Sequence, residues 1–171
     1  MTGSREVITG GDFKRMVSGA YSEFLLEYET INSHEGAGTL PGTHILRTIG
    51  AAVLPLADAK DDSIGGLSRR VATAAVFGAR GNAGVVLAQM FRGIATGLIG
   101  KYEATGSEFG KAFQYGILYA QRAMPDKLES PFIYVAKAVA KGAYRAVRDG
   151  MPISEILEQT IKTRSEERRV G

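Results

Sequence analysis

Three glycines spaced three residues apart mark the stretch of this chain that is best suited to bind an anion. Gly78, Gly81 and Gly84 punctuate the segment FGARGNAGVVLAQMFRG, which runs directly into an apolar helix. Glycines leave room for a ligand, and the free N–H groups at a helix N-terminus bind anions such as phosphate. Arg80 and Asn82 add a cation and an amide beside those groups. The alternative is a tight turn between closely packed helices, with Arg80 as a surface cation and Asn82 as a turn residue.

The elements that must position this turn are helices. Apolar residues recur at steps of three and four along most of the chain, and no segment shows the sustained alternation of a β-strand. The first helix is expected to start at Asp12, and the second to run from Thr43 to Leu56 after a loop at residues 30–42. Further helix starts are expected at or near Ser63, Ala83, Ser107, Ser130 and Ser154. We therefore predict an all-α antiparallel bundle of about seven helices.

Composition limits the class of protein. With 171 residues, 44% of them apolar and 23% charged, the chain fits one globular domain. A net charge of +3 spread along the chain does not indicate nucleic-acid binding. The chain has no cysteine, which excludes disulfides, and its apolar runs are far shorter than the roughly 20 residues of a membrane span. We expect a cytoplasmic protein with no nucleic-acid partner and no membrane span.

The same patterns predict the domain boundaries. Residues 1–11 are polar and glycine-bearing, and we expect a flexible lead-in there. Residues 12–163 are expected to form the helical domain. Residues 164–171, RSEERRVG, interrupt a helix that is still running and resemble a translated sequencing adapter. We interpret them as a non-native tail, which predicts that the domain is truncated at its C-terminal end.

The block GARGNAGVVLAQ is similar to the GARGNSGVILSQ-type block of the DhaL-like family. That family includes the nucleotide-binding subunit of dihydroxyacetone kinases and the N-terminal domain of the fatty-acid kinase A subunit. The similarity extends in weaker form from about Asp12 to Thr163. It implies an antiparallel barrel of about eight α-helices, so that seven to eight are expected here. It also implies ATP or ADP and magnesium, held at one end of the barrel by loops.

The resemblance assigns the phosphates of the nucleotide to the glycine turn. Ala83 replaces a serine whose hydroxyl bonds a phosphate oxygen in the family, so the backbone donors are what is left there. Gly42 and Thr43 match the end of the family's metal-binding loop. The cofactor-binding residues that the resemblance implies are Gly78, Ala79, Arg80, Gly81, Asn82, Ala83, Gly84, Gly42 and Thr43.

The metal-binding loop departs from the family pattern NVFPVPDGDTGTN, whose aspartates supply oxygen ligands to magnesium. The corresponding stretch is NSHEGAGTLPGTH, in which Gly38 and Leu40 replace the two aspartates and His44 replaces the final asparagine. Glu35 and Asn32 are the candidate metal ligands that are left. The two histidines of the chain lack a recognised metal-ligand spacing, so we interpret His44 as a loop or capping residue.

Three functions are compatible with these residues. The first is a nucleotide-binding domain of the dihydroxyacetone and fatty-acid kinase class with a degenerate magnesium loop, weak or inactive in phosphoryl transfer. The second is an active ATP-dependent kinase domain, whose acyl or small hydroxyl substrate is delivered by a partner protein or by C-terminal domains. The third is a non-enzymatic helical interaction module. No motif in the chain identifies the catalytic residues or the substrate.

Overall fold

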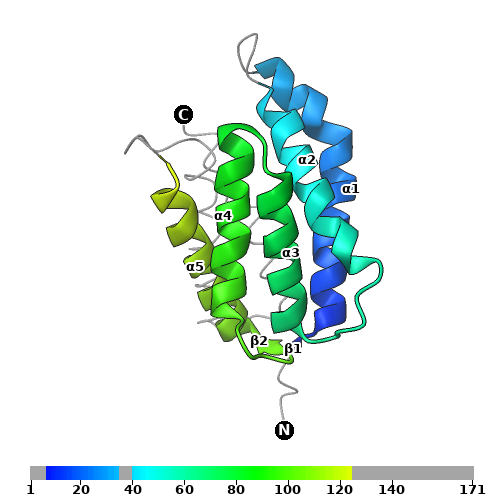
Figure 1. Cartoon of the computed structure of the whole chain (residues 1–171), viewed down its shortest axis with the longest axis vertical. Coiled ribbons are helices and arrows are strands. Elements are labelled where there is room, and N and C mark those ends of the chain that lie inside the picture. Colours follow the sequence, from blue (N-terminus) through cyan, green and yellow to red (C-terminus); the bar gives the residue numbers. More distant parts are fainter. Residues whose placement is uncertain (1–6, 35–39, 125–171) are drawn as a thin grey trace, which may run out of the picture.

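The computed structural model describes residues 7–34 and 40–124. Within these ranges the chain forms five α-helices that run up and down in turn (Figure 1). They are α1 (Gly10–His34), α2 (Pro41–Val53), α3 (Ile64–Gly78), α4 (Gly81–Gly97) and α5 (Gly106–Arg122), with a 3-10 helix η1 (Leu54–Leu56) after α2. The all-α prediction is confirmed. The helices expected from Ser130 and Ser154 lie outside the described residues, so the described count stays below seven to eight.

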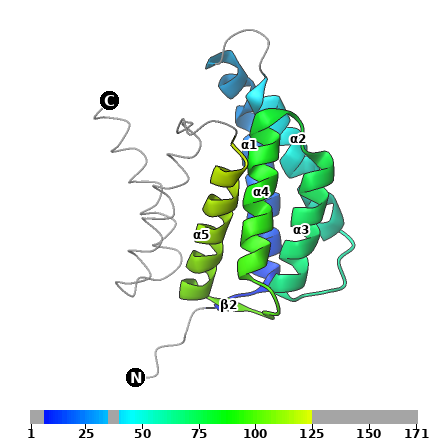
Figure 2. The ribbon, with the colours of Figure 1, turned by 60° about the vertical axis from the view of Figure 1, so that its left-hand side comes forward.

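The direction of the helices brings two helix N-termini together. α2 packs against α1, α3 and α4, and α4 packs against α3 and α5. α2 and α4 both begin at the end of the bundle where α1 and α3 finish (Figures 1 and 2). The positive ends of two helix dipoles therefore lie at the same end of the molecule. No helix in the described ranges combines the length and the hydropathy that crossing a bilayer requires.

Small residues let these helices approach one another closely. Ala52, Ala75 and Ala112 are fully buried in the core. Gly93 of α4 lies against the backbone of α5, where an added Cβ would stand 2.6 Å from the Cα of Gly116. A side chain at either glycine would force α4 and α5 apart, because the neighbouring backbone cannot move aside as a flexible side chain can.

Two very short strands close the opposite end of the bundle. β1 (Val7–Ile8) pairs antiparallel with β2 (Ala104–Thr105), with Ile8 opposite Ala104. Both of these side chains are buried in the core. Residues 7–11, expected to belong to a flexible lead-in, therefore form β1 and the start of α1. The reason is that Ile8 packs into a core built by residues distant in sequence.

Short polar side chains fix the starts of α1 and α3. Ser63 caps α3 as predicted, since its Oγ accepts a hydrogen bond from the N–H of Gly66 at 3.1 Å. α1 begins at Gly10, two residues before the start expected at Asp12. Thr9 accepts from the N–H of Asp12 at 3.1 Å, while the Asp12 carboxylate accepts from the N–H of Thr9 at 2.9 Å. Such a reciprocal pair satisfies N–H groups that the helix itself leaves free.

The start of α5 has the same reciprocal arrangement. Its N-cap is Thr105, two residues before the predicted Ser107, and the Thr105 Oγ1 accepts from the N–H of Glu108. The Glu108 carboxylate accepts in return from the N–H of Thr105 and from Lys101 Nζ, each at 2.9 Å. These hydrogen bonds hold the pKa of Glu108 below its ordinary value, and the bond from the Thr105 N–H has the largest effect. The stability they provide is therefore lost as the pH falls through that lowered pKa.

The variant Thr105→Ala tests this cap. It leaves the N–H of Glu108 without its acceptor, and we expect the free energy of unfolding to fall by about 1 kcal/mol. Ser107→Ala is the matched control, because Ser107 is exposed and its loss is expected to change that free energy by less than about 0.5 kcal/mol. Urea unfolding followed by circular dichroism measures both. Equal losses in the two variants would show that Thr105 is not the cap.

Candidate functional site

The glycine turn is shorter than the sequence predicts. α3 continues to Gly78 and α4 begins at Gly81, so that Ala79 and Arg80 alone connect the two helices. The start of α4 lies two residues before the one expected near Ala83. The chain reverses at Gly81, whose φ of +63° lies in the left-handed region that glycine adopts without strain. Much of the expected loop is therefore the first turn of a helix.

Two of the three glycines allow the turn to pack closely against α2. A Cβ added at Gly78 would overlap the side chain of Ala51, and one added at Gly84 would lie 2.6 Å from Thr48 Oγ1. Thr48 is fully buried, and its hydroxyl donates to a backbone carbonyl of α2 at 2.8 Å. Close helix packing therefore accounts for glycine at positions 78 and 84, in agreement with the alternative interpretation of the glycine spacing.

The third glycine brings the start of α2 to the turn. A Cβ added at Gly81 would overlap the imidazole ring of His44, with its Cε1 2.6 Å away. His44 lies in the first turn of α2, where its N–H donates to the carbonyl of Leu40 at 3.0 Å. Sequence reasoning missed this contact. The available signal was that His44 stands at the last position of the family's metal-binding loop, where the family has asparagine.

A second set of expected site residues meets where α1 ends and α2 begins. Asn32 donates from Nδ2 to Thr43 Oγ1 at 2.8 Å, and its Oδ1 accepts from the N–H of Thr43 at 3.2 Å. Gly42 is buried beside them, where an added Cβ would lie 2.9 Å from Asn32 Oδ1. This pair of hydrogen bonds ties the two ends of the loop together. It also fixes the first turn of α2, and with it His44, against Gly81.

The polar side chains of the turn itself face solvent. Arg80 donates from Nη1 to the carbonyl of Ala79 at 2.8 Å and to that of Phe77 at 3.3 Å, at the end of α3. Asn82 is exposed on the first turn of α4. Arg80 occupies the N-cap with an extended backbone, and no side chain there accepts a hydrogen bond from α4. The first N–H groups of α4 are therefore open to an external acceptor.

The charge around the turn favours an anion. From Ser63 to Tyr102 the chain carries five Lys and Arg residues and no Asp or Glu. α2 carries Arg47 and contains no acidic residue. Of these cations, Arg80 stands at the N-cap of α4 and adds its charge to the positive end of that helix, whereas Lys101 follows the other end of α4 and pairs with Glu108.

Two of the positions expected in the metal-binding loop, Asn32 and Leu40, lie within the described residues. Leu40, at one of the family's aspartate positions, is half exposed and offers no oxygen from its side chain. Asn32 already accepts from the Thr43 N–H, and Glu35 and Gly38 lie outside the described residues. In the two described ranges, Asp, Glu and His do not gather in any group of three that could hold a metal ion.

A family model matches most of the chain. The DAK2 domain model matches residues 41–168, from the start of α2 into the predicted tail. This chain belongs to the DAK2 domain family. The resemblance to the DhaL-like domain, stated from the glycine block, is thereby confirmed.

Several relatives of this DAK2 domain come from Staphylococcus and Bacillus species. An uncharacterized protein of Staphylococcus epidermidis is 30% identical over 125 residues, which are 73% of this chain and 23% of the relative. An uncharacterized protein of Staphylococcus haemolyticus is 31% identical over 120 residues, 70% of this chain and 22% of the relative. Protein YloV of Bacillus subtilis is 38% identical over 82 residues, 48% of this chain and 15% of the relative. The chain therefore spans less than a quarter of the length of these relatives.

Proposed function

We propose that this DAK2 domain binds the phosphates of ATP or ADP at the start of α4, and that it is weak or inactive in phosphoryl transfer. The observation that carries the proposal is Gly81, whose positive φ opens an uncapped helix N-terminus beside the first turn of α2. Free N–H groups and positive dipole ends then face the same phosphate. The proposed nucleotide-binding residues are Gly78, Ala79, Arg80, Gly81, Asn82, Ala83, Gly84, Gly42 and Thr43.

Low turnover follows from the loss of the metal ligands. Phosphoryl transfer relies on magnesium and cationic groups to offset charge on the γ-phosphoryl, with little covalent chemistry from the protein. Gly38 and Leu40 provide no carboxylate for such a metal. A single preorganised electrostatic donor is worth about 3 kcal/mol in comparable sites. Loss of two ligands therefore leaves a nucleotide site that lacks the means to stabilise the transition state.

An active kinase domain is the second candidate. Its support is the pair of hydrogen bonds between Asn32 and Thr43. These bonds hold together the two ends of the loop that carries Glu35, and the second of these ends lies near the start of α4. In that case Glu35 supplies the metal ligand. The substrate, an acyl or small hydroxyl compound, is then delivered by a partner protein or by further domains, because the relatives are more than four times as long as the matched part.

Calorimetric titration separates these functions. We expect ATP and ADP to bind the 171-residue chain weakly, with an affinity that magnesium changes by less than about threefold. Adenosine, which lacks phosphates, is the control and is expected not to bind. Micromolar binding that requires magnesium would refute the degenerate site and favour the active kinase. No binding under either condition would refute both, and would leave the helical interaction module.

The domain boundaries are a separate proposal. We infer that the domain expected over residues 12–163 also includes β1 and the start of α1, and that residues 164–171 are a non-native tail, although the family match reaches residue 168. Deletion of residues 164–171 is then expected to leave both the thermal midpoint and the nucleotide affinity of the chain unchanged. A fall in either quantity would show that the tail belongs to the domain.

A further inference from the structure

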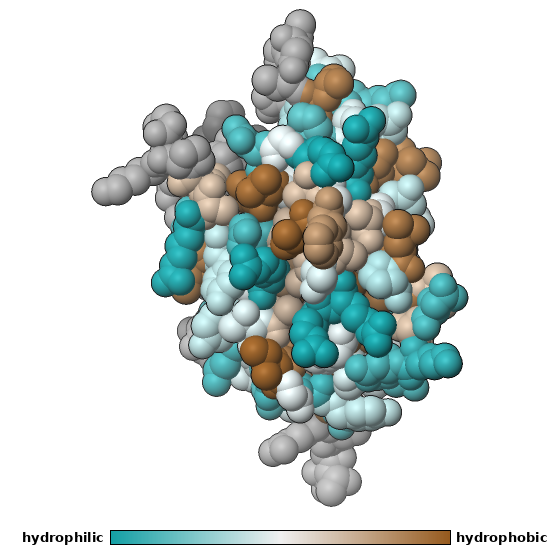
Figure 3. Space-filling view, in the orientation of Figure 1, coloured by the Kyte–Doolittle hydropathy of each residue, from teal (hydrophilic) through white to brown (hydrophobic). Residues whose placement is uncertain are grey.

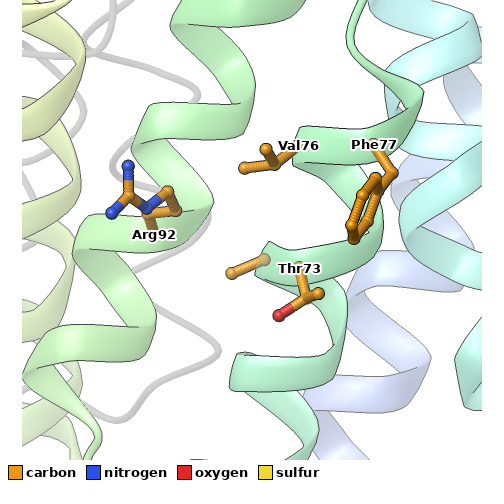
Figure 4. A pocket seen from close by; sticks show the side chains of 5 residues that line it. Thr73, Val76, Phe77 and Arg92 are labelled. Carbon is orange, nitrogen blue, oxygen red and sulfur yellow. The ribbon is translucent and has the colours of Figure 1, made fainter.

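The outer face of α3 and α4 carries a shallow apolar pocket. Its volume is about 270 Å³, and it lies on the face that Figure 3 presents, where apolar side chains gather near the C-terminal end of α3. Figure 4 shows Val76 and Thr73 of α3 facing Arg92 of α4 across it, with Phe77 beside them. Phe77 is 80% exposed, an unusual exposure for a phenylalanine. Small-molecule sites usually measure about 300–1,000 Å³, so this pocket suits an anchoring side chain.

Cations that form no salt bridge in the described ranges lie near the pocket, although Arg69 is close enough to Asp61 to help lower the pKa of that carboxyl. Arg69 is exposed one turn before Thr73 on the same face of α3, and Arg92 lines the pocket itself. Arg92 bonds the neutral Gln89 at 3.2 Å, and Arg80 bonds backbone carbonyls. Within the described residues, none of these three guanidinium groups forms a salt bridge. A partner that covers this face therefore needs carboxylates around an apolar side chain.

The chain carries such a surface on α1. Leu26 is 76% exposed, and Glu23, Glu27 and Glu29 lie within three residues of it on the same helix. Residues 16–46 contain four glutamates and no Lys or Arg. In the described part of the chain, these glutamates of α1 form no salt bridge. The outer surface of α1 is thus the electrostatic and apolar complement of the pocket on α3 and α4.

The two surfaces cannot meet within one copy of the chain. α1 and α4 lie on opposite sides of α2 and α3 in the bundle (Figure 1). We infer that the pocket of one copy receives Leu26 of a second copy, with Arg69 and Arg92 facing Glu23 and Glu27. The contact joins different surfaces of the two molecules, so it is heterologous and either closes by symmetry or continues to larger assemblies.

Sedimentation velocity of the 171-residue chain tests this contact. Self-association is expected, and it should weaken at least about tenfold between about 0.05 M and 0.5 M NaCl, because salt screens exposed charge pairs. Arg92→Glu is expected to weaken it about tenfold or more even at low salt. Lys111→Glu on α5, an exposed residue with the same change of charge, is the matched control and should have no effect.

Charge exchange makes the test specific to the two surfaces. Glu23→Arg with Glu27→Arg should weaken association as Arg92→Glu does, and the triple variant should recover at least part of it. Circular dichroism confirms that each variant is folded. A chain that is monomeric at all salt concentrations would overturn the inference, as would equal effects of Arg92→Glu and Lys111→Glu. The variants Phe77→Asp and Leu26→Asp provide a further check. If Phe77→Asp weakens association and Leu26→Asp does not, the inference is also overturned, because the pocket is then occupied by a surface other than that of α1.

Discussion

Gly81→Ala is expected to abolish nucleotide binding and to lower the free energy of unfolding by about 2–5 kcal/mol. A residue with a Cβ at a φ of +63° costs about 1–2 kcal/mol. The new methyl group would also overlap the ring of His44. Overpacking of this kind typically costs a further ~1–3 kcal/mol. Relief of that overlap moves α2 away from the start of α4, which separates the two helix N-termini that the proposed phosphate site requires.

The chain provides a matched control at Gly100. This glycine also has a positive φ, +73°, but an added Cβ there would meet no atom within 4 Å. Gly100→Ala should therefore cost only the backbone part, about 1–2 kcal/mol, and should leave the affinity for ATP unchanged. The combined variant Gly81→Ala with His44→Ala removes the overlap and should recover part of the stability.

Urea unfolding and calorimetry with ATP measure these effects. If Gly81→Ala and Gly100→Ala are destabilised equally, the contact with His44 carries no energy and the turn is held by other groups. If Gly81→Ala binds ATP as the parent chain does, the start of α4 is not the phosphate site, whatever the stability of the variant.

The helices are the part of this fold that the sequence predicts well, because their apolar stripes are local. Ser63 was identifiable as a cap for the same reason, since it immediately precedes such a stripe. At the start of α5, Thr105 and Ser107 are both able to cap. Glu108 decides between them, because it stands three residues after Thr105 and returns the hydrogen bond. That spacing is visible in the sequence, and a search for a reciprocal cap would have found it.

The glycine turn is harder to predict because its geometry depends on a distant helix. The spacing of Gly78, Gly81 and Gly84 fits both a ligand loop and close packing. Two of the three glycines pack against α2, and only the structure of α2 reveals this. The same holds for His44, whose position against Gly81 depends on the tie between Asn32 and Thr43. The anion site and its nucleotide stay predictions, and their support is the open start of α4.

Restoring both family aspartates is expected to make nucleotide binding depend on magnesium. In the variant Gly38→Asp with Leu40→Asp, magnesium should raise the affinity for ATP at least about tenfold, whereas the parent chain should respond by less than about threefold. Two carboxylates supply the hard oxygen ligands that let magnesium bridge protein and phosphate. The exchange at Leu40 costs little packing, because that side chain is half exposed.

Position 40 also has a structural role that the control must separate from metal binding. Leu40 is the N-cap of α2 and provides no side-chain hydrogen bond, so aspartate there is expected to stabilise the helix by about 1 kcal/mol. Asparagine caps a helix about as well as aspartate but has no charge to hold a cation. Gly38→Asn with Leu40→Asn should therefore match the stability gain in urea unfolding without any gain in magnesium dependence. If the asparagine variant gains the same magnesium dependence, the effect comes from helix capping. If neither variant responds to magnesium, the loop does not reach the nucleotide, and the loss of its aspartates does not support the proposal of weak phosphoryl transfer.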